Sequence, residues 1–219
     1  AWKEYNMQEV AGIVNKLSAG LLKMGFGKGD GTVEGRSKIA LIAKNRPEWV
    51  LLDLAVQQIG AVLTPVYPTI NELELAFILN DAGVEIIFVN DAALFEKVNS
   101  IKTEVPLLKE IISFENADHV KHWSEIISMA DEASMQKVKD IAATIQYEDL
   151  ATIIYTSGTT GKPKGVMLSH KNILSNVMDS MERFPPGDNL KSLSFLPLNH
   201  IFERMVTYLY LYRGTSIYY

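Results

Sequence analysis

The sequence contains no cysteine among its 219 residues, so no disulfide framework can hold the fold together. This absence fits the reducing conditions of the cytoplasm. The sequence also lacks any run of about 20 apolar residues, the length that a membrane-spanning helix requires. Its opening residues, AWKEYNMQEV, contain neither the basic nor the apolar region of a secretory signal. We therefore expect a cytoplasmic protein without a transmembrane segment.

An excess of positive charge is missing as well. The chain has 21 lysine and arginine residues against 26 aspartate and glutamate residues, which gives a formal net charge of −5. Proteins that bind nucleic acid usually carry a basic surface that displaces counterions from the phosphates. We therefore expect no nucleic-acid partner, and any phosphate-bearing ligand has to be bound by a local group of residues. What the sequence does have is ordinary globular composition, with 47% hydrophobic and 21% charged residues.

Short apolar runs alternate with amphipathic segments up to about residue 115. Apolar runs bounded by turn residues predict buried strands, and apolar residues three or four positions apart predict helices. The predicted strands are 38–43, 61–66, 85–89 and 110–114, and the predicted helices are 7–25, 48–59, 70–80 and 91–101. Strands that alternate with helices in this way form parallel sheets with helices on both faces. The predicted fold class is α/β, with mostly parallel sheets flanked by helices.

Three predicted helices begin with capping signals. Asn6 and Glu9 can cap the first helix reciprocally, Asn45 precedes the second, and Thr69 with Glu72 precedes the third. Side chains of this kind accept hydrogen bonds from the backbone N–H groups that a helix start leaves without partners. These residues therefore predict where each helix begins.

In the segment 115–149 the alternation of apolar runs and amphipathic segments is less regular, and the residues are more polar than those before it. Only one helix is predicted there, around residues 122–130, so the segment is interpreted as a possible linker between two sheets. His119 and His122 lie in it three residues apart. A zinc site usually has three or four protein ligands, and no further ligand is near them in the sequence. A metal site is therefore not predicted here.

The stretch ATIIYTSGTTGKPKGVMLSH, residues 151–170, changes from apolar residues to glycine, hydroxyl and lysine residues and back again. A Walker A loop needs GxxxxGK followed by serine or threonine, but Gly161 and Lys162 are followed by Pro163. The dinucleotide fingerprint fails too, because the glycine spacing differs and no helix opens at the loop. Since GVMLSH alternates like a strand, the loop is predicted to join two strands and to bind an anion at a hairpin tip. Lys162 and Lys164 could both point towards that anion; a flexible turn with solvated lysines is the alternative.

TIIYTSGTTGKPKGVMLSH resembles, almost position for position, the AMP-binding signature of the acyl-adenylate-forming enzymes. That superfamily includes acyl-CoA ligases, luciferases and the adenylation domains of peptide synthetases. NRPEWVLLDLAVQQIGAVLTPVYPT, residues 45–69, is similar to an early segment of the family, and SFLPLNHIFERM, residues 194–205, to its second core motif. Within the family, LPLNHIFER looks most like long-chain fatty acyl-CoA ligases. The resemblance covers nearly the whole chain and implies the N-terminal part of the adenylate-forming fold.

The resemblance also implies a reaction in two steps. Such enzymes join a carboxylate to the α-phosphate of Mg·ATP with release of pyrophosphate, and then transfer the acyl group from AMP to the thiol of coenzyme A. The implied partners are ATP, Mg²⁺, coenzyme A and a fatty acid. The alternatives are another carboxylate, aryl or short-chain, and a catalytically silent nucleotide-binding module. Peripheral contact with a membrane and the oligomeric state are left open.

The motif match assigns roles to particular residues of this chain. The residues that would wrap the β- and γ-phosphates of ATP are Ser157, Gly158, Thr159, Thr160 and Gly161. Lys164 falls where the family places a cation near these phosphates, and Thr156 falls where a hydroxyl touches the magnesium ion. His200 falls where a residue lies near the acyl carboxylate, so Lys164 and His200 are the candidate catalytic residues. For His200, a partly buried loop histidine bonded by backbone groups is an alternative of equal weight.

The neighbours of His200 in the motif are expected to be structural. Phe195, Leu196 and Leu198 are predicted to lie in the core. Glu203 and Arg204 are predicted to form a salt bridge with each other or to orient nearby groups. Both expectations follow from the residue types rather than from the motif.

The family continues beyond the last residue, Tyr219, with a ribose-binding aspartate, a hinge and a small C-terminal domain that carries a catalytic lysine. We therefore expect residues 1–219 to be a fragment of the adenylation domain, inactive alone and lacking the C-terminal part of the domain and the lid domain. Such a fragment is expected to expose apolar surface that favours association.

Overall fold

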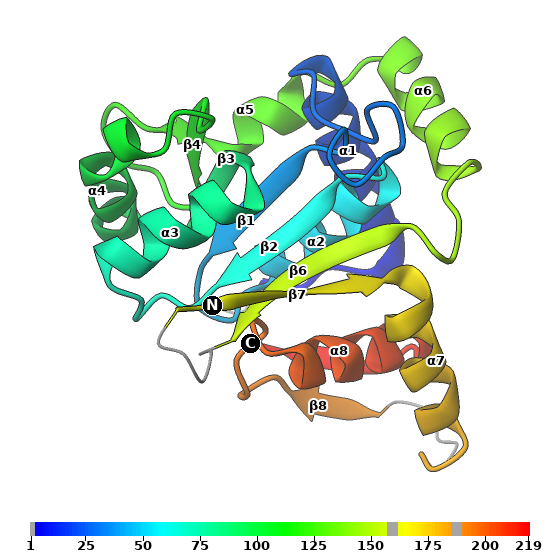
Figure 1. Ribbon diagram of the computed structural model, residues 1–219. Helices are drawn as coiled ribbons and strands as arrows, with labels where there is room; N and C mark the ends of the chain where they lie inside the picture. Colours follow the sequence, from blue (N-terminus) through cyan, green and yellow to red (C-terminus); the bar gives the residue numbers. More distant parts are fainter. Residues whose placement is uncertain (1–2, 157–161, 185–189) are drawn as a thin grey trace.

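A seven-stranded sheet runs through the centre of the molecule in the computed structural model (Figure 1), which describes residues 3–156, 162–184 and 190–219. Its strands are β1 (Lys38–Ile42), β2 (Val62–Val66), β3 (Val84–Val89), β4 (Glu110–Ser113), β5 (Lys121–His122), β6 (Leu150–Thr156) and β7 (Lys164–Ser169). They lie in the order β5-β4-β3-β1-β2-β6-β7. All neighbours are parallel except β6 and β7, which are antiparallel. The predicted α/β class and mostly parallel sheet are confirmed.

Helices cover both faces of this sheet, and each face has its own hydrophobic core. Successive side chains of β1 point to opposite faces, so Ile39 and Leu41 join the first core and Ala40 and Ile42 join the second. The helices on the first face are α1 (Met7–Lys23), α2 (Pro47–Gln58), α5 (Trp123–Ser128) and α6 (Glu132–Ala142), and those on the second are α3 (Glu72–Ala82) and α4 (Ala92–Ser100), with a 3-10 turn at Lys102–Glu104. No helix among the described residues has both the length and the apolar character needed to cross a membrane.

A smaller unit follows β7. It consists of α7 (His170–Met181), β8 (Lys191–Leu193), α8 (Ile201–Arg213) and β9 (Ser216–Tyr218), and β8 pairs with β9 in parallel. Ile173 and Val177 of α7 pack with Ala151 of β6 and Leu209 of α8 in a third core. Figure 1 shows α7, α8 and β8 gathered beside β7, far from α4. Helix α8 is thereby placed next to the hairpin that β6 and β7 form.

Asn45, predicted as the cap of the second helix, has a different role. Arg46 occupies the N-cap position of α2 without a side-chain capping bond, and Pro47 opens the helix. Proline suits this first position because its missing N–H would have no helical partner in any case. The Asn45 side chain instead bonds Ser194, which lies 149 residues later in the chain. The capping prediction was wrong because a distant segment competes for this amide.

The other two capping predictions had different outcomes. Asn6 and Glu9 form the predicted capping box, in which each side chain bonds the other residue's backbone N–H. The third helix is capped by Asn71, whose side chain accepts a hydrogen bond from the Glu74 N–H at 2.9 Å. Thr69 was the wrong candidate, because the helix begins two residues later than a cap at this position requires.

Residues 115–149 connect two strands of the same sheet. Strand β5 pairs with β4 and extends that edge of the sheet. Helices α5 and α6 then pack against α1. The chain returns to the sheet as β6, which lies beside β2. The close approach of α5 to α1 depends on Gly20, because a Cβ at this position would lie 2.0 Å from the Ile126 carbonyl oxygen. In the described part of the chain, the segment therefore does not link two separate sheets.

The two histidines of this segment serve the turn before α5. His122 is the N-cap of α5, and its ring nitrogens lie 2.6 Å from Ser124 Oγ and 2.9 Å from the Phe114 carbonyl oxygen. His119 adopts a left-handed backbone conformation with φ of 63°. Among residues 3–156, 162–184 and 190–219, no group of three or more His, Cys, Asp or Glu side chains is arranged to hold a metal ion.

Candidate functional site

The two strands that flank the predicted phosphate loop, β6 and β7, meet the loop at the edge of the sheet where the parallel strands end. Strands β1 to β4 and β6 all run in the same direction, so their carboxyl ends meet at this edge. The loop leaves the carboxyl end of β6 and returns to the amino end of β7. Ligands of open α/β sheets bind at this edge. The position expected from the sequence is therefore the position at which such folds bind ligands.

Thr156 and Lys164 form the last residue pair of the β6–β7 hairpin before the loop. They are partners in the strand register, so their side chains extend from the same face, with Cβ atoms about 5 Å apart. Both residues are exposed, and neither side chain bonds another residue among those the structure describes. A hydroxyl and an ammonium group thus stand side by side. Five residues assigned to the phosphates lie outside the described residues: Ser157, Gly158, Thr159, Thr160 and Gly161.

The hairpin is tightly built below this pair. Gly165 is the register partner of Tyr155, and a Cβ on Gly165 would lie 3.1 Å from the tyrosine ring and 2.9 Å from the Ile153 side chain. The Tyr155 hydroxyl donates a hydrogen bond to Asp81 Oδ2 at 2.6 Å, which ties the hairpin to α3. Burial, aided by Asp81, raises the pKa of Tyr155 above its ordinary value. Tyr155 is therefore a neutral anchor rather than a proton acceptor.

A magnesium ion fits this pair only together with its nucleotide. Mg²⁺ takes six oxygen ligands and usually keeps several waters and substrate phosphates. Thr156 offers a single hydroxyl oxygen beside the Lys164 ammonium. Thr156 alone would therefore not hold a metal ion, and its hydroxyl could supply one ligand to an ion whose other ligands come from water and a bound phosphate.

The crevice between β1 and β3, where this sheet changes its winding direction, is filled by side chains. Arg46 Nε donates to Glu48 Oε2 at 2.9 Å, and its Nη1 donates to Asn90 Oδ1 at 3.2 Å. The same Nη1 lies 3.3 Å from Glu115 Oε1, and the guanidinium lies 5.2 Å from the centre of the Phe114 ring. These groups therefore satisfy one another at the ends of β1, β3 and β4.

Asn45 attaches the second sequence motif to the same edge. It follows the carboxyl end of β1, and its Nδ2 donates to the carbonyl oxygens of Ser194 at 3.2 Å and Leu196 at 2.7 Å. Its Oδ1 accepts from the Leu198 N–H at 3.0 Å. One amide side chain thus pairs with three backbone groups of this segment. The motif around residues 194–199 is thereby fixed beside the sheet edge.

His200 is the N-cap of α8, and it is held in place from both sides. The preceding residue, Asn199, is buried and accepts a hydrogen bond from Trp49 Nε1 at 3.0 Å. His200 Nδ1 accepts from the Phe202 N–H at 3.2 Å, so the neutral ring carries its proton on Nε2. The residue is exposed. One ring nitrogen therefore bonds the backbone, and the other bonds no residue among those described.

Arg204 joins α8 to two other elements below this position. Its Nε donates to Asp53 Oδ2 of α2 at 2.9 Å, and its Nη2 donates to Asp53 Oδ1 at 2.5 Å. Its Nη1 donates at 2.7 Å to Thr152 Oγ1 of β6, whose hydroxyl donates at 2.6 Å to the Leu63 carbonyl of β2. The Tyr208 hydroxyl, one turn further along α8, also donates to Asp53. The Asp53 and Arg204 side chains are each only 1% exposed, so this ion pair lies in the interior.

The charges of this network follow from its surroundings. Burial opposes the charged form of Arg204, but Asp53 outweighs it and keeps the pKa of Arg204 above its ordinary value. Burial raises the pKa of Tyr208 despite the nearby guanidinium, so the hydroxyl keeps its proton. Glu203 does not pair with Arg204, because adjacent helical residues do not face each other. It accepts from Ser194 Oγ at 2.8 Å instead, so that predicted salt bridge was wrong.

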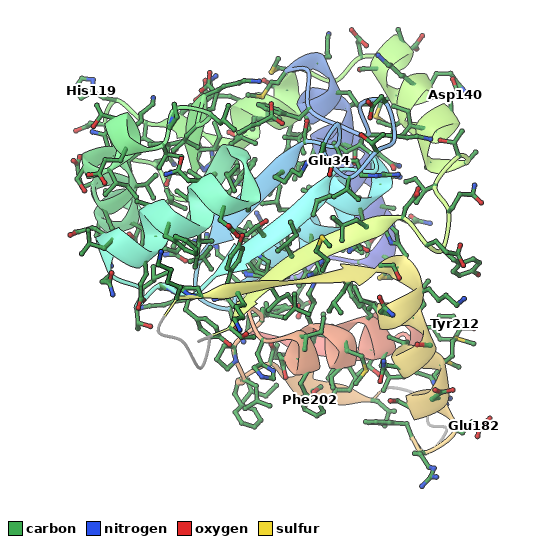
Figure 2. The ribbon with its side chains drawn as sticks, in the orientation of Figure 1. Glu34, His119, Asp140, Glu182, Phe202 and Tyr212 are labelled. Atoms are coloured by element: carbon green, nitrogen blue, oxygen red, sulfur yellow. The ribbon has the colours of Figure 1, made fainter. Side chains whose placement is uncertain are left out.

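The expected core position of three apolar residues was correct for one of them. Leu198 is 1% exposed, but Phe195 is 74% exposed and Leu196 is 37% exposed. Phe202 is 54% exposed on the first turn of α8 (Figure 2). Exposed apolar side chains therefore lie on both sides of His200 in the sequence of this motif.

Sequence reasoning missed Asn45, Asp53 and Thr152 as residues that organise the site. A signal was available for one of them, since Asp53 interrupts the apolar helix sequence WVLLDLAV. A carboxylate at such a buried position requires a paired charge. The identity of that partner depends on the fold and is not visible in the sequence.

His170 opens α7 close to the buried Arg204–Asp53 ion pair and the partly buried Arg36–Asp149 ion pair. Its Nε2 is buried and has no hydrogen-bond partner among the described residues. Burial lowers the pKa of His170, and the positive charges of Arg36 and Arg204 lower it further. The negative charges of Asp149 and Asp53 raise it, but by less. The folded protein therefore favours the neutral ring.

We predict that acidification destabilises the protein through His170. Because its folded pKa lies below the unfolded value of about 6.5, the stabilisation is complete above that pH and is lost as the pH falls through the folded pKa. Urea unfolding between about pH 7.5 and pH 5 measures this loss. The variant His170→Gln cannot titrate and should show a shallower fall. Equal pH dependence in both proteins would contradict the prediction.

The chain is similar to known proteins over its whole length. A family model described as AMP-binding enzyme matches residues 1–219. The chain is 32% identical over 221 residues to long-chain-fatty-acid–CoA ligase 6 of Mus musculus, covering 94% of this chain and 30% of the ligase. It is 32% identical over 227 residues to the peroxisomal long chain acyl-CoA synthetase 7 of Arabidopsis thaliana, covering 99% of this chain and 31% of that protein. The chain thus spans about a third of the length of the curated relatives it matches.

The fold has relatives among solved structures as well. The crystal structure of the anthranilate CoA ligase AuaEII in complex with anthranoyl-AMP matches with a TM-score of 0.82. The two sequences are 19% identical, and the match covers 99% of this chain and 39% of that one. At this identity the likeness shows the fold alone. It agrees with the parallel sheet and the antiparallel β6–β7 hairpin described above.

Proposed function

Because the chain belongs to the AMP-binding enzyme family, we propose that it provides the phosphate-binding and carboxylate-binding part of an AMP-forming ligase. This ligase activates a long-chain fatty acid and transfers it to coenzyme A. The observation that carries the proposal is the exposed pair of Thr156 and Lys164 at the carboxyl edge of the sheet. His200 follows a segment that Asn45 and Trp49 hold at that edge. A hydroxyl, an ammonium group and an imidazole are donors that two anionic reactants require.

The phosphate end of ATP is assigned to the β6–β7 hairpin. Lys164 supplies a positive charge that stabilises the leaving pyrophosphate, and no described carboxylate pairs with that charge. The hydroxyl of Thr156 provides one oxygen ligand for Mg²⁺. When bound with ATP, the metal ion would neutralise phosphate charge as it develops. Residues 157–161 are proposed to wrap the β- and γ-phosphates, as the family motif implies.

The acid is assigned to the surface that begins at His200. Its Nε2–H is a donor for a carboxylate oxygen, since Nδ1 is already occupied by the Phe202 N–H. The exposed side chains of Phe195 and Leu196, which precede His200 in the same motif, offer an apolar surface. Each methylene group that such a surface removes from water contributes about 0.8 kcal/mol. This favours an acid with a long alkyl chain.

The proposed reaction consists of two displacements. A carboxylate oxygen attacks the α-phosphorus of ATP, the bond to the bridging oxygen breaks, and pyrophosphate leaves with those electrons. The thiolate sulfur of coenzyme A then attacks the acyl carbon, and AMP leaves. In the first step the protein contributes orientation of the two anions and stabilisation of the leaving group.

The test is carboxylate-dependent exchange of labelled pyrophosphate into ATP. It is measured with acids from acetate to stearate, both on this chain and on a longer protein that contains it and spans the full length of the relatives. Exchange that rises with chain length supports the proposal. ATP binding without exchange for any acid would favour the catalytically silent nucleotide-binding module. Absence of ATP binding would overturn the proposal.

A second candidate substrate class is an aryl acid. The exposed side chains of Phe195 and Phe202 favour it, because they could stack on an aromatic ring. Benzoate and anthranilate in the same exchange assay decide between the classes. The proposal also includes a cytoplasmic location, which fractionation of cells that produce the protein tests.

A further inference from the structure

Arg204 connects three elements that the proposed site depends on. Within α8, the Arg204 backbone N–H donates to the His200 carbonyl oxygen at 3.2 Å, and this hydrogen bond closes the first turn of the helix. Through Nη1 it bonds Thr152 on β6, and through Nε and Nη2 it bonds Asp53 on α2. Its guanidinium also lies 5.8 Å from the centre of the Trp49 ring. Trp49 in turn bonds Asn199, next to His200.

The spacing along each element relates these contacts to the site. His200 lies four residues before Arg204, about 6 Å along the helix axis. Thr156 lies four residues after Thr152 on the same face of β6, about 13 Å along the strand. The hydrogen bond between Arg204 and Thr152 therefore joins one rigid segment that ends at His200 to another that ends at Thr156. It is a short link between the two halves of the site.

We propose that Arg204 is a positioning residue that fixes His200 relative to Thr156, with Asp53 aligning its guanidinium and Thr152 receiving it on β6. The planar guanidinium suits this role because its donors point in fixed directions to two different acceptors. This proposal rests on the proposed function for its catalytic consequence. The geometric part, a fixed separation between the start of α8 and the hairpin, holds independently of any activity.

The geometric part is tested on this chain with pairs of spin labels. Since the chain has no cysteine, Met167→Cys on β7 and Phe202→Cys on α8 provide unique attachment points, and both residues are exposed. The variant Thr152→Val keeps a β-branched residue but removes the acceptor of Arg204 Nη1. We expect the measured distance distribution to become about twofold broader in this variant. An unchanged distribution overturns the proposal.

A matched control separates positioning from general loss of stability. Arg36 and Asp149 form another ion pair, at 2.8 Å, in which the arginine side chain is 2% exposed. Both residues precede the strands β1 and β6, at the amino edge of the sheet. Arg36→Lys should leave the distance distribution unchanged. If Thr152→Val does not fold, Tyr208→Phe, which removes a hydroxyl bonded to Asp53, takes its place in the same measurement.

The catalytic consequence is tested by a double-mutant cycle in the pyrophosphate exchange assay, on the longer protein. Thr152→Val should lower kcat between about 10-fold and 100-fold, the effect of a small misplacement of reacting groups, with the KM for ATP nearly unchanged. In a His200→Ala background, Thr152→Val should have no further effect on kcat. Equal losses in both backgrounds, or no loss from His200→Ala alone, overturn this part. If the parent protein catalyses no exchange with any acid, the proposed function fails, and the spin-label result still decides the geometry.

Discussion

Replacement of Lys164 by alanine is expected to slow carboxylate-dependent pyrophosphate exchange by about 100-fold or more, the usual effect of removing one preorganised donor from a reacting centre. The loss should appear in kcat rather than only in the KM for ATP, because the ammonium group stabilises charge that collects on the leaving pyrophosphate. The fold should not change. Lys164 is exposed at the start of β7 and bonds no other residue among those described, so the free energy of unfolding should change by less than about 0.5 kcal/mol.

Lys171 provides the matched control for this measurement. It is also an exposed lysine, but it belongs to α7 and lies 3.4 Å from Glu148 in an exposed ion pair. Such surface pairs contribute little, and Lys171→Ala should leave the exchange rate within about twofold, as expected for a surface change away from the site. Comparable losses in the two variants would show that Lys164 acts only through the overall charge of the surface. An unchanged rate in Lys164→Ala would refute its assignment to the phosphates.

The largest expected change in stability comes from breaking the buried ion pair. Arg204→Met should reduce the free energy of unfolding by about 3–5 kcal/mol, because it leaves the Asp53 carboxylate buried without its opposite charge. Urea or thermal unfolding followed by circular dichroism measures the change. The remaining donors to Asp53 are the Tyr208 hydroxyl and Gln57 Nε2. Neither carries a positive charge, so they cannot replace the guanidinium.

The double variant Asp53→Asn with Arg204→Met distinguishes a charge effect from a packing effect. Asparagine removes the unpaired charge, and its single amide oxygen still accepts the hydrogen bond from Gln57, while its NH2 group can donate to the Tyr208 hydroxyl. If the buried charge is the main cost, the double variant should be more stable than Arg204→Met by about 1–3 kcal/mol. Stability equal to or below that of the single variant would assign the loss to the packing of the arginine side chain instead.

Local features of the fold could be predicted from the sequence, whereas features that depend on distant partners could not. The first capping box and the left-handed Gly83 that ends α3 are set by residues within one helical turn. The strands of the central sheet except β5 (Lys121–His122) were predictable for the same reason, since β-branched and apolar runs are local signals. Asn45 carried a good local signal too, but its side chain bonds a segment about 150 residues away.

In the candidate site, too, local features could be predicted from the sequence and features that depend on distant segments could not. The motif placed Thr156 and Lys164 on the two arms of a hairpin, and the strand register agrees with that prediction. The burial of Arg204 and the exposure of Phe195 run against their residue types. Both depend on how the segment after residue 190 meets the sheet edge, and a single sequence does not contain that information. Residue type predicts average burial, and it is least reliable where a segment lies at the edge of a core.

The single register pair between β2 and β6 has a mechanical consequence. These neighbours pair at only one position among the described residues, Leu63 with Thr152, whereas β1 pairs with β2 at five positions. The hairpin is therefore attached to the first five strands by a seam that contains little backbone pairing. Thr152 is the residue at which this seam is held, since its hydroxyl also bonds the Leu63 carbonyl and Arg204. Under load, the sheet should part first along this line, where the bonds of Thr152 to Leu63 and Arg204 would break, while α8 stays attached to α2 through Arg204 and Asp53.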